Sequence, residues 1–156
     1  MTPNLSRRLF TILALTFAYL IVSSIGAGVA IGRGLPATWG GLLSSDNEVW
    51  VDFLIGGGTA LSPPVGSLVL IAAAAVGSFR TDRIGRVATL LLAALVAFNV
   101  IGMLGEPITW RSIAPDTFDP LTASISVLMA AIPAALAVVA FNEFRARRAA
   151  AAAAKR

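Results

Sequence analysis

Residues 9–31 form a run of 23 residues that contains no charged side chain. At a rise of about 1.5 Å per residue, a helix of this length crosses the roughly 30 Å hydrocarbon core of a bilayer. A cleavable signal peptide is the competing interpretation, because Arg7 and Arg8 precede the run and small residues end it. The run is longer than the roughly 7–15 apolar residues of a signal peptide, so we predict a retained membrane helix.

The composition of the whole chain agrees with this prediction. Of the 156 residues, 57% are hydrophobic and only 13% are charged, against about 25% charged in an ordinary soluble domain. The mean hydropathy is +0.84. A water-soluble protein of this size could not cover so much apolar surface. We therefore predict an all-α integral membrane protein that forms a single domain over residues 1–156.

Three further apolar runs lie at 61–79, 87–105 and 121–141, and they predict a four-transmembrane-helix bundle. Proline residues mark the ends of these runs, at Pro63 and Pro64 in the first turn of the second span, at Pro107 after the third, and at Pro120 before the fourth. Long loops are predicted at 32–60 and 106–120, with the segment 49–55 lying on the membrane surface or against the bundle.

Two shorter features refine these boundaries. Thr81 or Asp82 can cap the third helix. The basic, Ala-rich tail 142–156 should continue the fourth helix, because Ala is the best helix former and Glu143 and Arg147 form a favourable i,i+4 pair.

The charges orient the spans. With the N-terminus inside, the predicted inner segments hold ten basic and two acidic residues, and the outer loops hold two basic and six acidic residues. Basic residues accumulate on the cytoplasmic side of membrane proteins, so we predict a plasma-membrane protein with both termini cytoplasmic. All three tryptophans, Trp39, Trp50 and Trp110, fall in the outer loops.

The absence of Cys and His excludes several chemistries. Thiol catalysis, disulfides, Cys/His zinc sites, iron–sulfur clusters and a His general base all require these residues. Carboxylates in the outer loops suit Ca²⁺ or Mg²⁺, but no EF-hand spacing is present, so neither a metal nor a cofactor is predicted. The net charge of +4 is not gathered on a soluble domain, so no nucleic-acid partner is predicted. Eleven Arg against one Lys resemble high-GC bacterial usage.

A candidate polar pocket lies at the outer end of the third span. Asn99, Met103 and Glu106 are spaced i, i+4 and i+7 and share one helix face. Asn99 lies six residues before Gly105, roughly 9 Å below the outer interface. An amide at this depth is costly against lipid and should face the bundle.

The first span offers a matching polar stripe, at Thr16, Tyr19, Ser23 and Gly26. We expect the two stripes to face each other, with Asn99 bonded to Ser23 or Tyr19. Two interpretations follow. The stripes line a small pocket open to the outside, formed by Tyr19, Ser23, Asn99 and Glu106, or the same side chains only hold the helices together.

The outer loops supply a candidate cap for this pocket. Glu106 with Arg111, and Asp116 with Arg33, can form ion pairs that close it. The alternative is that these are solvated loop charges. The candidate cap residues are Arg33, Asp46, Glu48, Trp50, Asp52, Trp110, Arg111, Asp116 and Asp119.

The predicted partners are the bilayer and other membrane proteins. Ser24, Gly28 and Gly32 repeat at i+4 and form a small-residue ridge suited to packing within the bundle or to a homo-oligomer. Basic residues on the inner side either bind anionic lipid headgroups or only set the topology; they are Arg80, Arg83, Arg86, Arg145, Arg147 and Arg148.

The inner loop GSFRTDRIGR resembles the loop between the second and third helices of major facilitator transporters, which reads G-x-x-x-D-R-x-G-R. The shared residues are Gly77, Asp82, Arg83, Gly85 and Arg86. The resemblance covers ten residues, its Gly-to-Asp spacing is one residue longer, and four spans are too few for a twelve-helix transporter. Helix capping and topology account for the same residues.

Three functions remain open. The first is non-enzymatic binding of a partner or small ligand at the outer face, where Trp and carboxylates concentrate. The second is a small oligomeric transporter or channel, although no span carries a charge deep within it, as coupled transport usually requires. The third is a membrane enzyme acting on lipid or quinone through Glu106. We favour the first.

The predicted topology is testable with reporter fusions. A reporter that is active only in the cytoplasm should be active when fused after Arg156 and inactive when fused within the loop 106–120. Activity in the loop fusion, or a periplasmic signal from the terminal fusion, would overturn the orientation.

Overall fold

The computed structural model describes residues 3–38 and 45–154, and within these residues all regular elements are helices. The all-α prediction is therefore confirmed for this part of the chain. The elements are α1 (Pro3–Arg33), α2 (Val49–Ile55), α3 (Val65–Gly77), α4 (Arg83–Gly105), α5 (Pro107–Ile113), the 3-10 turn η1 (Pro115–Thr117) and α6 (Pro120–Ala153).

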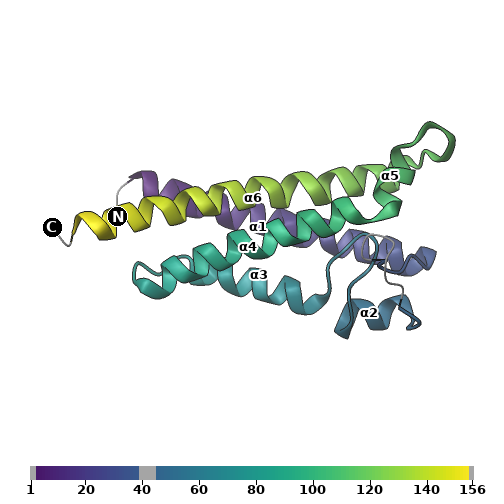
Figure 1. Ribbon diagram of the computed structural model, residues 1–156, viewed down its shortest axis with the longest axis horizontal. Coiled ribbons are helices and arrows are strands. Elements are labelled where there is room, and N and C mark those ends of the chain that lie inside the picture. Colours follow the sequence, from purple (N-terminus) through teal and green to yellow (C-terminus); the bar gives the residue numbers. More distant parts are fainter. Residues whose placement is uncertain (1–2, 39–44, 155–156) are drawn as a thin grey trace.

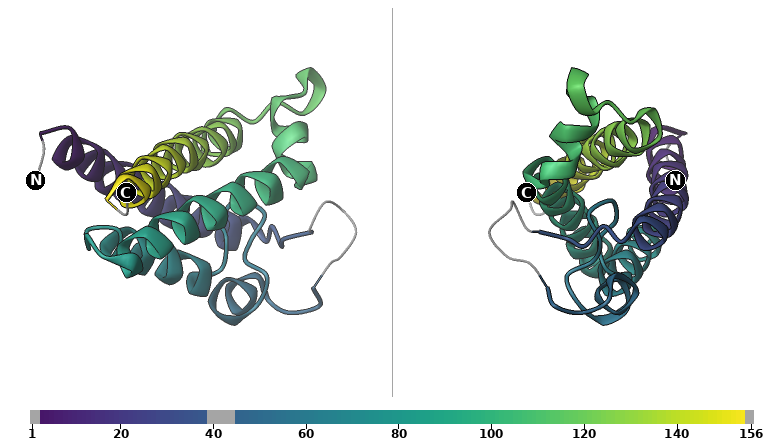
Figure 2. Two further views of the ribbon diagram at one scale, coloured as in Figure 1. Left: turned by 60° about the vertical axis from the view of Figure 1, so that its left-hand side comes forward. Right: turned by 90° about the vertical axis from the view of Figure 1, so that its right-hand side faces the viewer.

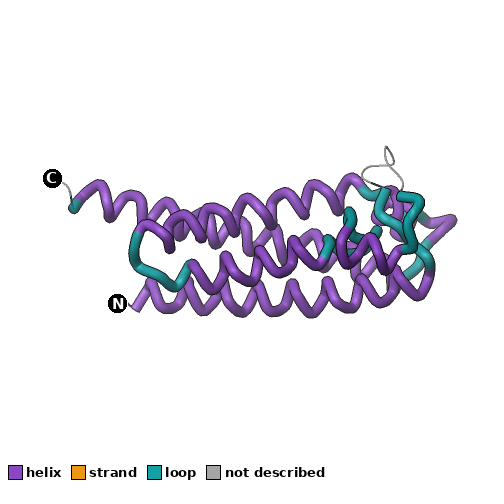
Figure 3. Tube along the Cα trace, turned by 90° about the horizontal axis from the view of Figure 1, so that it is seen from below, coloured by secondary structure: helices purple, strands orange, loops and turns teal. Residues whose placement is uncertain are grey.

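Helices α1, α3, α4 and α6 lie side by side, as Figures 1 and 3 show. α6 packs along both α1 and α4, and α3 packs mainly against α4. The start of α1, the turn at 78–82 and the end of α6 gather at one end of the molecule, here called the termini end (Figure 1). Residues 34–38, 45–64 and 106–119 form the opposite end, the loop end, which the end view of Figure 2 faces.

Three of the described helices are long and apolar enough to cross a membrane: α1 from Arg7, α4 and α6. This finding is consistent with a membrane protein. The predicted second span at 61–79 is not one continuous helix: α3 has only 13 residues, fewer than the about 20 of a helix that crosses a membrane. The count of four spans stays a prediction. Residues 61–64 are not helical, since each proline removes a backbone donor and disfavours helical geometry in the residue before it.

The segment 56–64 is not helical, and residues 58–62 within it are buried. Thr59 and Ser62 exchange backbone hydrogen bonds, with N···O distances of 2.8 and 3.3 Å, and the Ala60 N–H donates to the Leu35 carbonyl at 3.2 Å. These bonds satisfy backbone groups that would otherwise be costly to bury. The segment can therefore lie inside the helical assembly and cap the start of α3.

Two helix-end predictions are confirmed. Asp82 caps α4, its carboxylate accepting from the Gly85 N–H at 3.1 Å, and the helix consequently begins at Arg83. α6 continues through the tail to Ala153, and Arg147 donates to Glu143 at 2.6 Å.

Among the residues that the structure describes, the small-residue ridge on α1 packs against no other element. Ser24, Gly28 and Gly32 are exposed, and a Cβ added at Gly28 or Gly32 would meet no atom within 4 Å. Large apolar side chains on the same helix, including Phe10 and Phe17, are also exposed. Such a surface suggests contact with lipid, and the ridge leaves space for a close helix contact with a second copy.

Gly26 and Gly28 provide a matched test of how the segment 56–64 is seated. A Cβ at Gly26 would lie 2.3 Å from the Leu61 carbonyl oxygen, whereas at Gly28 it would meet nothing. Gly26→Ala should lower the free energy of unfolding by about 1–3 kcal/mol through overpacking. Gly28→Ala should be neutral or stabilising by up to about 1 kcal/mol, because Ala favours helix. Thermal unfolding in detergent measures both, and equal stability of the two variants would contradict this packing.

Candidate ligand-binding cavity

A cavity of about 530 Å³ lies between α3 and α4 toward the loop end. Tyr19 of α1 and Met129 of α6 also line it, and the segment 57–64 and Ala37 complete its wall. Asn99 and Glu106 of α4 both contribute to the lining. The face that the sequence singled out thus borders open volume rather than being filled by neighbouring side chains.

Asn99 joins three helices at the polar wall of the cavity. Its Nδ2 lies 3.1 Å from the Tyr19 hydroxyl of α1 and 3.3 Å from the Ser67 hydroxyl of α3. The predicted contact with Tyr19 is present. The predicted alternative partner, Ser23, instead donates to the Met129 sulfur at 3.5 Å and does not line the cavity.

Glu106 is set at the cavity wall by the break between α4 and α5. Gly105 ends α4, Glu106 takes an extended conformation, and Pro107 begins α5. The side chains of Thr109 and Trp110 donate to the last carbonyls of α4, at 2.8 and 2.7 Å, and so fold α5 back over the helix end. These bonds replace the helical partners that the break removes.

The Glu106 carboxylate is buried and bonded to the segment after α1. The Thr38 N–H lies 3.1 and 3.2 Å from its two oxygens, and the Thr38 hydroxyl donates at 2.8 Å. The predicted ion pair with Arg111 is not formed, and Arg111 is exposed. A buried carboxylate requires such hydrogen bonds, and here a backbone amide and a hydroxyl supply them.

The described lining of the cavity differs between the loop end and the flank of α3 and α4. Ala37, Thr59 and Ser62 at the loop end are buried. By contrast, the lining side chains Leu70, Phe98 and Ile101 are 54%, 58% and 68% exposed. The cavity thus has an apolar, exposed rim on the flank of α3 and α4, and the predicted opening to the outside stays a prediction.

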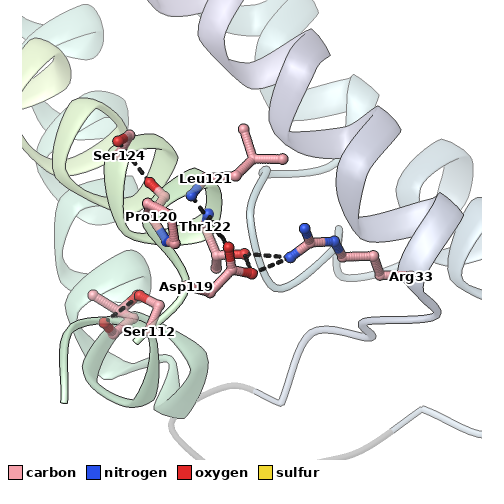
Figure 4. A network of polar contacts seen from close by, with 8 residues as sticks. Arg33, Ser112, Asp119, Pro120, Leu121, Thr122 and Ser124 are labelled. Atoms are coloured by element: carbon pink, nitrogen blue, oxygen red, sulfur yellow. Dashed lines mark hydrogen bonds and ion pairs between the residues drawn. The ribbon is translucent and has the colours of Figure 1, made fainter. Parts of the chain in front are cut away.

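A second network of polar side chains links α1 to the start of α6 (Figure 4). Arg33 pairs with Asp119 and also donates to the Thr122 hydroxyl at 2.9 Å. Asp119 caps α6 by accepting from the backbone N–H groups of Leu121 and Thr122. The predicted pair of Arg33 with Asp116 is wrong, and Asp116 is exposed. Arg33 pairs with Asp119 and not with Asp116 because Asp119 lies directly before α6. There its carboxylate can cap α6 and bind the Arg33 guanidinium at the same time.

The remaining cap candidates divide into one buried carboxylate and several exposed groups. Asp52 is buried and accepts from Ser45 at 3.0 Å and from Asn47 at 3.1 Å, which corrects the expectation of a solvated charge. Glu48 accepts from the Trp50 indole. The exposed candidates are Asp46, Glu48, Trp50 and Trp110, and Trp39 lies outside the described residues.

The predicted basic residues lie at the termini end. Arg80 pairs with Asp82 at 2.7 Å, and Arg147 with the buried Glu143. Arg147 also donates to the Arg80 carbonyl at 2.8 Å, which links α6 to the turn at 78–82. The exposed members are Arg83, Arg145 and Arg148, and Arg86 is half-buried.

Sequence reasoning missed several cavity residues. Ser67 and Thr38 contact Asn99 and Glu106, and Gly102 lies on the rim. Ser67 could have been noticed as a hydroxyl within an apolar run. Nothing in the sequence pointed to Thr38, because its hydrogen bonds to Glu106 depend on where the chain after α1 turns back.

Comparisons of the chain with protein-family models, with curated proteins and with solved structures find no match. The cavity is therefore interpreted from its own geometry and chemistry.

The Asp119 cluster predicts a pH-dependent stability. The Thr122 hydroxyl and then Arg33 lower the pKa of Asp119 to about 2, from an ordinary value near ~3.9. Because the pKa of Asp119 is lower in the folded state, its carboxylate stabilises the fold at pH values above the ordinary pKa of aspartate. This contribution is lost as the pH falls toward 2. Asp119→Asn should therefore lower the Tm at pH 7, with the difference from wild type shrinking between about pH 4 and pH 2.

Asp116→Asn is the matched control, because Asp116 is exposed in the same loop. It should leave the Tm unchanged throughout this pH range. Equal Tm values for the two variants at pH 7 would show that the Arg33–Asp119 pair contributes nothing to stability.

Proposed function

We propose that the protein binds a small amphipathic molecule in the cavity between α3 and α4, without chemical conversion, and that the molecule enters from the bilayer. The observation that carries this proposal is the polarity gradient across the cavity. Asn99, Tyr19 and Ser67 form a polar wall inside, and the exposed rim is apolar. An amphiphile would place its polar head at the wall and its apolar part at the rim.

The proposal includes a topology. The charge bias supports both termini on the cytoplasmic side of the plasma membrane, with α1, α4 and α6 as full spans and the segment 56–64 plus α3 as a fourth crossing. Non-helical backbone at membrane depth is tolerated where it is buried in protein, as residues 58–62 are. In this orientation the cavity faces the outer leaflet.

The lining chemistry restricts the ligand. Tyr19, Asn99 and Ser67 offer hydroxyl and amide groups that donate and accept hydrogen bonds. Of the lining side chains that the structure describes, Glu106 is acidic and none is basic. A neutral or cationic head, such as an alcohol, amide, quinone or amine, is therefore favoured over a carboxylate or phosphate. The volume suits a molecule of drug-like size.

Because the chain lacks cysteine, single thiols can report on access to the cavity. Ser67→Cys places a thiol at the polar wall, and Ser126→Cys places one at a buried position that does not line the cavity. In proteoliposomes, membrane-permeant N-ethylmaleimide should label the Ser67→Cys protein at least about 10-fold faster than the Ser126→Cys protein, since buried thiols are inert. Equal rates would contradict an accessible cavity.

Binding of an amphiphile in the cavity can be tested with the same Ser67→Cys protein. 1-Decanol should protect the Ser67→Cys thiol saturably, and decanoate should protect it much less because of Glu106. Gly102→Trp, at a rim position where an added Cβ meets nothing within 4 Å, should abolish protection. Gly66→Trp is the control, because it has the same open surroundings but does not line the cavity. Protection that is unsaturable, or unaffected by Gly102→Trp, would refute binding there.

A further inference from the structure

A second cavity, of about 590 Å³, lies at the termini end between α1 and α6. Three arginines line it, Arg7 and Arg8 from α1 and Arg145 from α6, together with the polar side chains of Thr11 and Asn142. Among the described residues, no acidic side chain lines it. We call this second cavity the basic groove. It is separate from the cavity between α3 and α4 and shares no lining residue with it.

The arginines of the groove differ in their pairing. Arg8 lies 3.7 Å from the buried Glu143 carboxylate. Arg7 and Arg145 have no side-chain partner among the residues that the structure describes. Their guanidinium groups are therefore available for an external anion. Guanidinium groups bind phosphate oxygens in bidentate geometry, and Asn142 and Thr11 can add hydrogen bonds.

The position of the groove along the helices indicates the kind of anion. Arg7 and Arg8 directly precede the uncharged run 9–31 of α1, and Val139 forms an apolar part of the groove wall. Toward the middle of α1, Ala14 lies seven residues after Arg7, and on α6 Ala135 lies seven residues before Asn142. Residues seven apart lie on the same face of a helix, so each alanine continues the face that lines the groove. Both alanines are exposed. Along both helices the basic groove is thus followed by a small apolar side chain that is exposed, which suits a phosphate with attached acyl chains.

We infer that this groove binds the phosphate headgroup of an anionic phospholipid, with Arg7 and Arg145 contacting the phosphate and the acyl chains lying along α1 and α6. Basic pockets between membrane helices are suited to such headgroups. Arg8 is held by Glu143 and fixes the groove wall. The site therefore joins the first and last helices of the chain through a lipid.

The test measures lipid binding by native mass spectrometry of the full chain in detergent. Phosphatidylglycerol should bind more tightly than phosphatidylcholine, and Arg7→Gln/Arg145→Gln should weaken phosphatidylglycerol binding by about 10-fold or more. Arg83→Gln/Arg148→Gln is the matched control, because it removes the same charge from exposed arginines outside the groove. It should bind phosphatidylglycerol as wild type does.

Three outcomes overturn the inference. Equal affinity for the two lipids excludes headgroup recognition, and equal weakening in the two double variants assigns binding to diffuse charge. Glycerol phosphate that competes as well as the lipid at equal concentration assigns the groove to a free phosphate ester. If the glutamine pair fails to fold, Arg145→Gln against Arg148→Gln carries the same comparison, with a several-fold loss expected only for Arg145→Gln.

Discussion

The burial of residues 58–62 without a helix is the constraint on which the loop end depends. A buried segment of this kind must pair its backbone polar groups locally or with neighbouring loops. It does so through the Thr59–Ser62 exchange and the bond from Ala60 to Leu35. Gly58 adopts a φ of +96°, which an L side chain rarely tolerates, and its N–H donates to the Asp52 carbonyl at 2.9 Å. The fold of this end thus depends on backbone hydrogen bonding as well as on apolar packing of Leu61 in the core.

The cavity lies at the same place. The segment 57–64 and α3 together form one side of it and α4 forms the other. Asn99 lies at the level where α3 begins and bonds to Ser67, so its amide is satisfied without the cavity being filled. Asn99 therefore both joins the helices and lines the cavity, and the binding role of the cavity stays a proposal.

Buried carboxylates have different partners at the two ends of the molecule. At the loop end, Asp52 and Glu106 are satisfied by hydroxyl, amide and backbone donors. At the termini end, Glu143 is 1% exposed and is satisfied by Arg147 and Arg8. Burying a charge is costly unless it is paired or hydrogen-bonded, and both solutions meet that requirement. The second solution also links Arg8 of α1 to α6, beside the basic groove that Arg7, Arg8 and Arg145 line.

The sequence by itself determined the helical class, the three long apolar helices, the Asp82 cap and the helical tail, because these depend on local hydrophobicity, capping residues and helix propensity. It also placed Asn99 and Glu106 on one face, since helical spacing is a local property. Only the tertiary structure decided that α3 is short, that Glu106 binds Thr38 and not Arg111, and that Arg33 selects Asp119 over Asp116. These outcomes depend on where distant segments meet, and a hydrogen bond forms only between groups that the fold brings within about 3 Å. Apolar runs fix which segments are buried, but the partners of the polar groups depend on the path of the intervening chain.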